Sequence, residues 1–261
     1  MQPQINVPTA GGALRDLITQ AAGQPPKALC FAARTDKGVH AIENIATFWF
    51  KGPFDVQSFL DKLHNLQTPG LRNIYARQVD PKFHARGNST GKRYCYVING
   101  PDPETSWQII PKLDLDAMQK ALGYVQGTHD FQSFRASGCT AGTSIKTLYE
   151  AKLTQTAEGL CIDLFGDAFL RQMIRILVGV LAEIGTGLRK PSDMLMILEA
   201  KSRQAAGITA PACGLTLLGV ELTCETISKD SSHLVGVRPL HCERVELFRP
   251  EGDAYGRQAI L

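Results

Sequence analysis

The chain has 261 residues, 28 Lys and Arg against 25 Asp and Glu, a formal net charge of +3, and 44% hydrophobic residues. These values are ordinary for a globular protein and fit one large domain or two smaller ones. The sequence excludes a membrane-spanning helix, because Arg171 and Glu183 interrupt the longest apolar run, from Phe169 to Ile184. The small positive charge is compatible with a nucleic-acid partner but does not require one.

The seven cysteines form no CxxC pair, and the histidines lack the HExxH spacing of a zinc enzyme. The sequence therefore predicts free thiols in a reducing compartment rather than a disulfide framework or a metal site. No glycine-rich loop supports the binding of ATP or NAD. The first residues show neither the basic nor the apolar region of a signal peptide, so we expect a cytoplasmic protein.

The first part of the chain predicts helices alternating with strands. Apolar residues at helical spacing predict a helix from Thr9 to Ala22 and another that begins at Asp55. Runs of apolar, aromatic and β-branched residues predict the strands, which are 28–32, 45–50, 74–79 and 92–98.

The second part repeats this order. Helices are predicted from Asp114, from Ala168 to Ile184 and from Ser192 to Ser202, and strands at 147–153, 160–165 and 215–222. The break at Asn99–Pro103 predicts the boundary between a domain of residues 1–100 and one of residues 101–223. Residues 224–261 form a polar tail with no assigned role. This pattern favours an α+β fold, with helices packed on one face of antiparallel sheet.

A polar turn at residues 33–41, with the sequence ARTDKGVHA, lies between the first two predicted strands. Gly38 permits a tight turn, and Asp36 stands between the cations Arg34 and Lys37. Asp36 fits two interpretations: a carboxylate offered to a substrate as a nucleophile, or an Asx-turn that only stabilises the loop.

Basic and aromatic residues near the other strands allow similar alternatives. Arg86, Arg93 and Tyr94 fit a surface that holds phosphates and stacks a base, or a strand face with charged decoration. Arg135 fits a phosphate contact or a solvated side chain beside core aromatics. Arg175 lies within an apolar helix, where a buried charge needs a partner. It fits an arginine paired with the catalytic carboxylate, which we favour, or an arginine at a helix end whose charge reaches the surface.

Five ordered stretches together resemble the tRNA pseudouridine synthase A family of bacterial enzymes. They are residues 33–41, 83–86 with 92–94, 127–135, 169–175 and 209–215. The resemblance extends roughly from Gln2 to Leu222. A single such motif is moderately specific, and five in the same order are strong.

The resemblance implies isomerisation of uridine to pseudouridine in tRNA, at positions 38 to 40 of the anticodon stem-loop. It implies Asp36 as the nucleophile, Arg175 as its partner, and Tyr94 as the ring that stacks on the flipped base. It leaves open whether a glycal, an acylal or a Michael adduct forms. The residues implied in substrate binding are Tyr94, Arg34, Arg86, Arg93, Arg135 and Leu215.

The resemblance also implies an architecture and its partners. We expect a homodimer whose subunits contain two ferredoxin-like α/β domains, with antiparallel sheets joined into one continuous sheet and a catalytic cleft between the domains. No metal or organic cofactor is implied. The family has a first strand before the segment that Gln2–Gln4 matches, and we expect this chain to lack it. An alternative function follows: a catalytically weak RNA-binding or chaperone-like homologue.

Overall fold

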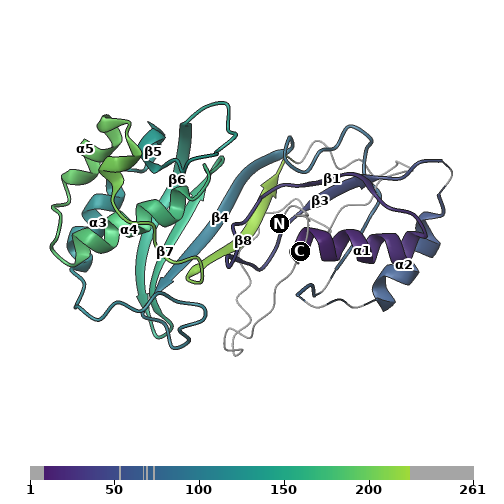
Figure 1. The fold of residues 1–261 in the computed structure, drawn as a ribbon, viewed down its shortest axis with the longest axis horizontal. Helices are drawn as coiled ribbons and strands as arrows, with labels where there is room; N and C mark the ends of the chain where they lie inside the picture. Colours follow the sequence, from purple (N-terminus) through teal and green to yellow (C-terminus); the bar gives the residue numbers. More distant parts are fainter. Residues whose placement is uncertain (1–8, 53, 67, 69, 73, 224–261) are drawn as a thin grey trace. The chain divides into compact units, whose positions relative to one another are not determined.

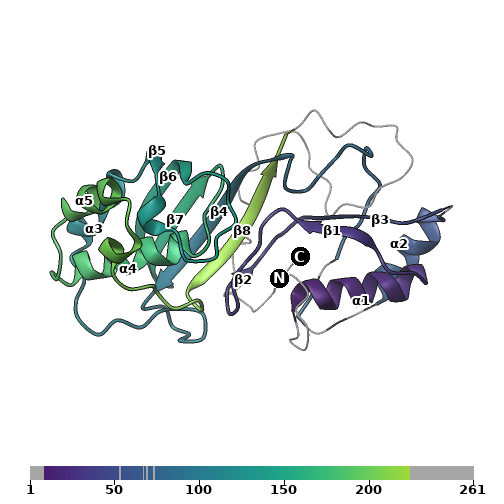
Figure 2. The same cartoon turned by 45° about the horizontal axis from the view of Figure 1, so that its top comes forward.

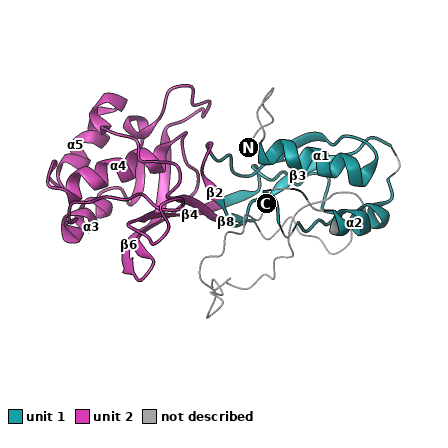
Figure 3. Cartoon of the chain, turned by 60° about the horizontal axis from the view of Figure 1, so that its bottom comes forward, with its two compact units in different colours: residues 1–35, 41–90, 220–261 teal, residues 36–40, 91–219 magenta. Residues whose placement is uncertain are grey.

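The computed structural model describes residues 9–52, 54–66, 68, 70–72 and 74–223 (Figure 1). The expectations about the first strand and the tail at 224–261 fall outside the described residues. The chain divides into two compact units (Figure 3). Unit 1 comprises residues 1–35, 41–90 and 220–261, and unit 2 comprises residues 36–40 and 91–219.

This division differs from the boundary predicted at residue 100. The strand β4 (Ser89–Ile98) begins in unit 1 and continues into unit 2, and β8 (Leu215–Leu222) passes back into unit 1. The break at Asn99–Pro103 leads into a turn closed by the N–H of Thr105 on the carbonyl of Asp102. Glycine, proline and asparagine residues indicate turns in a sequence. They do not reveal a boundary between two units that falls inside a hydrogen-bonded strand.

In its described residues, unit 1 contains two helices and an antiparallel pair of strands. Helices α1 (Ala10–Ala22) and α2 (Val56–Asn65) lie along one face of the antiparallel pair β1 (Lys27–Phe31) and β3 (Ala46–Trp49), as Figures 1 and 2 show. The predicted helix starts are confirmed, because Thr9 and Asp55 accept backbone N–H groups as N-caps. The core between them is apolar and includes Leu14, Leu17, Ile18, Phe31, Phe48, Phe59 and Leu63.

The strand predicted at 74–79 is wrong, because the described residues of this segment form no strand. Ile74 and Ala76 are instead partly buried against the core of unit 1. Within this segment Arg77 takes part in a single β-bridge, and the sequence pattern does not separate such a partly buried apolar segment from a strand. The two-residue strand β2 (His40–Ala41) was not predicted.

Unit 2 carries most of a six-stranded sheet in the order β2-β8-β4-β7-β6-β5. Strands β5 (Gly127–Asp130), β6 (Ile145–Thr156) and β7 (Gly159–Gly166) pair antiparallel in sequence, and β4 pairs antiparallel with β7. Helices α3 (Leu115–Gly123), α4 (Met173–Gly185) and α5 (Asp193–Ala200) gather on one side of it (Figure 2). The short 3-10 turns η1 (Gln132–Phe134) and η2 (Arg203–Ala206) contact α4 and α5.

The α+β class is confirmed. The hydrogen-bonded strands in the described part of the chain nevertheless form two sheets, β1-β3 and the sheet of six, where one continuous sheet was expected. The separation arises because the β1–β3 pair ends at Phe31 and Ala46, before the polar turn.

The register of β4 sorts its side chains onto two faces. Tyr94 and Tyr96 lie opposite Leu164 and Ile162 of β7, which are fully buried. Arg93 lies opposite Phe165 and points to the other face, because successive side chains of a strand alternate. This alternation decides which of the candidate residues can share one site.

Candidate active site

Asp36 lies in a turn that is fixed mainly by the backbone. The N–H of Val39 donates to the carbonyl of Asp36 at 3.1 Å. Gly38 has φ +83°, and a Cβ there would lie 3.3 Å from the Cβ of Ala212, so both conformation and space favour glycine. The Asp36 side chain is 29% exposed and can be reached from solvent.

Arg175 faces the Asp36 carboxylate. Its Nη1 lies 3.3 Å from Oδ2 of Asp36, and its side chain is only 14% exposed. Its Nε donates to the carbonyl of Ala210 at 2.8 Å. The ion pair expected from the sequence is therefore formed, and Arg175 is held at a second point. Its charge is compensated, as a mostly buried guanidinium requires.

The helix that carries Arg175 begins later than predicted. Helix α4 starts at Met173 rather than Ala168, because Gln172 at its N-cap adopts the left-handed conformation, with φ 59°. Residues before it form a loop that is tied to a neighbouring segment, since the N–H of Ala136 donates to the carbonyl of Arg171. Arg175 therefore lies in the first turn of the helix, where its neighbours Ile174 and Ile176 are buried.

Tyr94 is a buried neighbour of this pair, with 6% exposure. Burial raises the pKa of its hydroxyl well above the ordinary value, and the negative charge of Asp36 raises it further. The hydroxyl therefore stays protonated and can donate a hydrogen bond. The ring of Phe169 lies edge-on to that of Tyr94, with centroids 5.1 Å apart.

Phe169 was not singled out by the sequence reasoning. The available signal was its position at the start of the apolar stretch that leads to Arg175. The structure thus places Asp36, Arg175, Tyr94 and Phe169 in unit 2, joined by one ion pair, one charge interaction and one ring contact.

Arg93 and Arg135 make contacts within unit 2. Arg93 pairs with Glu150 at 3.1 Å, and its guanidinium lies 4.7 Å from the ring centroid of Phe165. Since Arg93 and Tyr94 point to opposite faces of β4, the structure does not bring them together. Arg135 donates to the backbone carbonyls of Cys139 and Ala141, and so braces the loop that follows it.

The remaining predicted residues differ in their exposure. Arg34 and Arg86 are exposed and belong to unit 1. Leu215 is 6% exposed at the start of β8, and its N–H donates to the carbonyl of Ala212. Leu215 therefore packs within the protein, whereas the two arginines present their charge to solvent.

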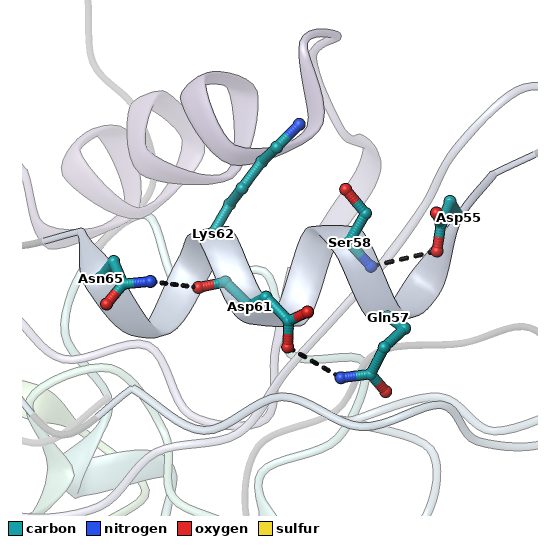
Figure 4. Close-up of a pocket in the computed structure, with 6 residues that line it drawn as sticks. All are labelled: Asp55, Gln57, Ser58, Asp61, Lys62 and Asn65. Carbon is teal, nitrogen blue, oxygen red and sulfur yellow. Dashed lines mark hydrogen bonds between the residues drawn. The ribbon is translucent and has the colours of Figure 1, made fainter.

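An open pocket lies along α2, lined by side chains of that helix and its N-cap (Figure 4). Its polar groups satisfy one another: Asp55 caps the N–H of Ser58, Gln57 donates to Asp61, and Asn65 donates to the carbonyl of Asp61. They are the ordinary contacts of a capped helix. We therefore assign the candidate active site to the Asp36 pair and not to this pocket.

Two further observations concern other classes of site. In the described part of the chain, no group of three or more His, Cys, Asp or Glu side chains is arranged to hold a metal ion. None of the helices among the described residues combines the length and apolar character needed to cross a membrane.

Comparison with known proteins gives consistent matches. A family model described as tRNA pseudouridine synthase matches residues 121–221. A protein from Acetivibrio thermocellus named tRNA pseudouridine synthase A is 36% identical over 225 residues, or 84% of this chain and 92% of that protein. Proteins of the same name from Syntrophotalea carbinolica and Neisseria gonorrhoeae are 35% and 34% identical, over 75% and 82% of this chain and 80% and 83% of their own lengths.

Proposed function

Because this chain belongs to the tRNA pseudouridine synthase family, it is an isomerase that forms pseudouridine in tRNA, and we propose that it modifies positions 38 to 40 of the anticodon stem-loop with Asp36 as nucleophile. The observation that carries this proposal is the ion pair between Arg175 and Asp36, beside the buried Tyr94. A carboxylate held by a fixed cation can act as a nucleophile, and a buried phenol beside it can contact the base.

The reaction breaks the C–N glycosidic bond of uridine, turns the released uracil and joins its C5 to the sugar, while C5 loses its proton and N1 ends with one. A target base in a stem-loop must first leave its stack. Unstacking one base costs on the order of a few kcal/mol. The Asp36 carboxylate, 29% exposed, is accessible enough to attack the flipped nucleotide. Arg175 orients this carboxylate through Nη1 and offsets the cost of partly burying it.

Tyr94 serves as a hydrogen-bond donor and as an aromatic contact for the uracil. Its raised pKa keeps the phenol protonated at neutral pH, so it remains a hydrogen-bond donor. Phe169 contacts the ring edge-on, and we propose that it shares the aromatic contact with the base. A hydrogen bond from the phenol would hold one orientation of the uracil as it turns.

The exposed arginines Arg34 and Arg86 are proposed to contact phosphates of the RNA. Arg93 and Arg135 would add to RNA binding only through N–H groups that their internal contacts leave over, because a guanidinium has five N–H donors. Leu215 would help to shape the site from the start of β8. A cytoplasmic homodimer that needs no cofactor completes the proposal.

The test is to map pseudouridine at each position of an unmodified tRNA transcript after incubation with the purified protein. We expect new pseudouridine at positions 38 to 40 and nowhere else in the transcript. A transcript whose uridines at these positions are replaced by cytidine is the matched control. Modification elsewhere would contradict the proposed target, and tight binding without any pseudouridine would support the RNA-binding alternative.

A further inference from the structure

We infer that Tyr96 is a positioning residue for the reaction, which acts by fixing the chain segment that holds Arg175. The Tyr96 side chain is fully buried, and its hydroxyl donates to the carbonyl of Pro211 at 2.9 Å. The preceding residue, Ala210, contacts Arg175 twice. Its carbonyl accepts Nε of Arg175 at 2.8 Å, and its N–H donates to the backbone carbonyl of Arg175 at 3.0 Å.

The segment around Ala210 lies directly against helix α4. Gly179 of that helix has no side chain, and a Cβ there would lie 2.3 Å from the carbonyl oxygen of Ile208. The segment therefore passes over α4 at backbone distance. At its far end, the carbonyl of Gly214 accepts the N–H of Val97 on β4 at 2.9 Å. Residues 208–214 thus connect the helix that carries Arg175 to the strand that carries Tyr94 and Tyr96.

Tyr96 is itself held rigidly. It stands on the same face of β4 as Tyr94, opposite Ile162. A Cβ at Gly214 would lie 2.8 Å from its ring, and the Trp107 ring lies edge-on at 6.5 Å between centroids. Burial raises the pKa of the Tyr96 hydroxyl above its ordinary value, by more than the nearby charge of Arg175 lowers it, so this group remains a hydrogen-bond donor at neutral pH.

The hydroxyl of Tyr96 contributes more than packing. A phenylalanine would fill the same space without the cost of burying a polar group. Pro211 has no N–H, so its carbonyl is the backbone group by which this residue can be held. Because Nε of Arg175 is fixed on Ala210, the position of this segment sets the direction in which Nη1 meets Asp36. The inference rests on the proposed role of the Asp36–Arg175 pair.

The first test compares Tyr96→Phe with the wild type on an unmodified tRNA transcript. We expect kcat to fall about tenfold, which is roughly one net hydrogen bond expressed as a rate, while KM for tRNA stays within about twofold. The matched control is Ser133→Ala, which also removes a buried hydroxyl that donates to a backbone carbonyl, that of Ile197. We expect this control to lose stability without losing kcat.

The second test separates positioning from a general structural effect. Arg175→Lys keeps the positive charge but lacks the Nε donor to Ala210, so the segment can no longer direct it. In the Arg175→Lys background, we expect Tyr96→Phe to cause no further fall in kcat. Falls that multiply in the double variant, or a Tyr96→Phe kcat equal to that of wild type, would overturn the inference.

If Tyr96→Phe does not fold, Gly214→Ala provides a second variant, since its Cβ would lie 2.8 Å from the Tyr96 ring and 2.8 Å from the carbonyl oxygen of Val97, so that it shifts the ring and the segment while the hydroxyl stays. The same loss of kcat, absent in the Arg175→Lys background, is expected. Turnover by Asp36→Asn would refute the proposed reaction alone, because the paired variants still decide whether Tyr96 acts through Arg175.

Discussion

Replacing Arg175 by methionine removes the cation that faces Asp36 while nearly keeping the side-chain volume. The change removes the contact of 3.3 Å to Oδ2 of Asp36 and the hydrogen bond of 2.8 Å to the carbonyl of Ala210. The Asp36 carboxylate is left partly buried without its counter-charge. We expect a strong loss of turnover with a smaller loss of stability.

The size of the loss expected for Arg175→Met depends on how deeply the ion pair is buried. Breaking a fully buried ion pair costs about 3–5 kcal/mol, and an exposed pair contributes below about 1 kcal/mol. With 14% and 29% exposure for the two side chains, this pair lies between these limits. A loss of about 1–3 kcal/mol, expressed wholly in the transition state, lowers kcat roughly fivefold to 150-fold.

The assay is a single-turnover measurement with enzyme in excess over an unmodified tRNA transcript, together with thermal unfolding of each variant. Arg171→Met is the matched control, because Arg171 lies on the same segment and its guanidinium donates instead to the carbonyl of Ser137. We expect the control to react within about twofold of wild type. A rate for Arg175→Met within that same range would refute the reasoning.

Two further predictions concern residues of β4. Tyr94→Phe keeps the ring but removes the hydrogen-bond donor, so we expect unchanged tRNA affinity and slower turnover; equal kcat for variant and wild type would show that the phenol does not orient the uracil. Arg93→Met tests a structural role: the hydrogen bond from Arg93 holds the pKa of Glu150 below its ordinary value of 4.5, so this stabilisation is present above that pH and is lost in acid. Urea unfolding should therefore show that Arg93→Met destabilises the protein at neutral pH more than in acid, and an equal effect at both would contradict this role.

N-cap residues and the spacing of apolar residues predicted much of the fold. The helix starts at Thr9 and Asp55 followed from side chains that accept backbone N–H groups, and the strand at 215–222 followed from its apolar pattern. The short strand β5 was missed, since its residues, GTHD, have little β-propensity and are set by pairing with β6. The late start of α4 depends on the left-handed Gln172, which no sequence pattern signals.

The candidate site was predictable in part. A charged Arg175 within an apolar helix required a partner, and Asp36 is the group that it meets. The internal contacts of Arg93 and Arg135 depend on strand register and loop path, which composition does not provide. The hydrogen bond from Tyr96 to Pro211 joins residues 115 positions apart, so only the folded chain reveals it.

The most direct test of the central claim is the turnover of Asp36→Asn on an unmodified tRNA transcript. The amide keeps the size of the side chain but removes its charge and its nucleophilic oxygen. We expect tRNA affinity within a few-fold of wild type and no detectable pseudouridine, even in a single turnover with excess enzyme. Pseudouridine formed at a rate near that of wild type would contradict the claim that the Asp36 carboxylate performs the reaction.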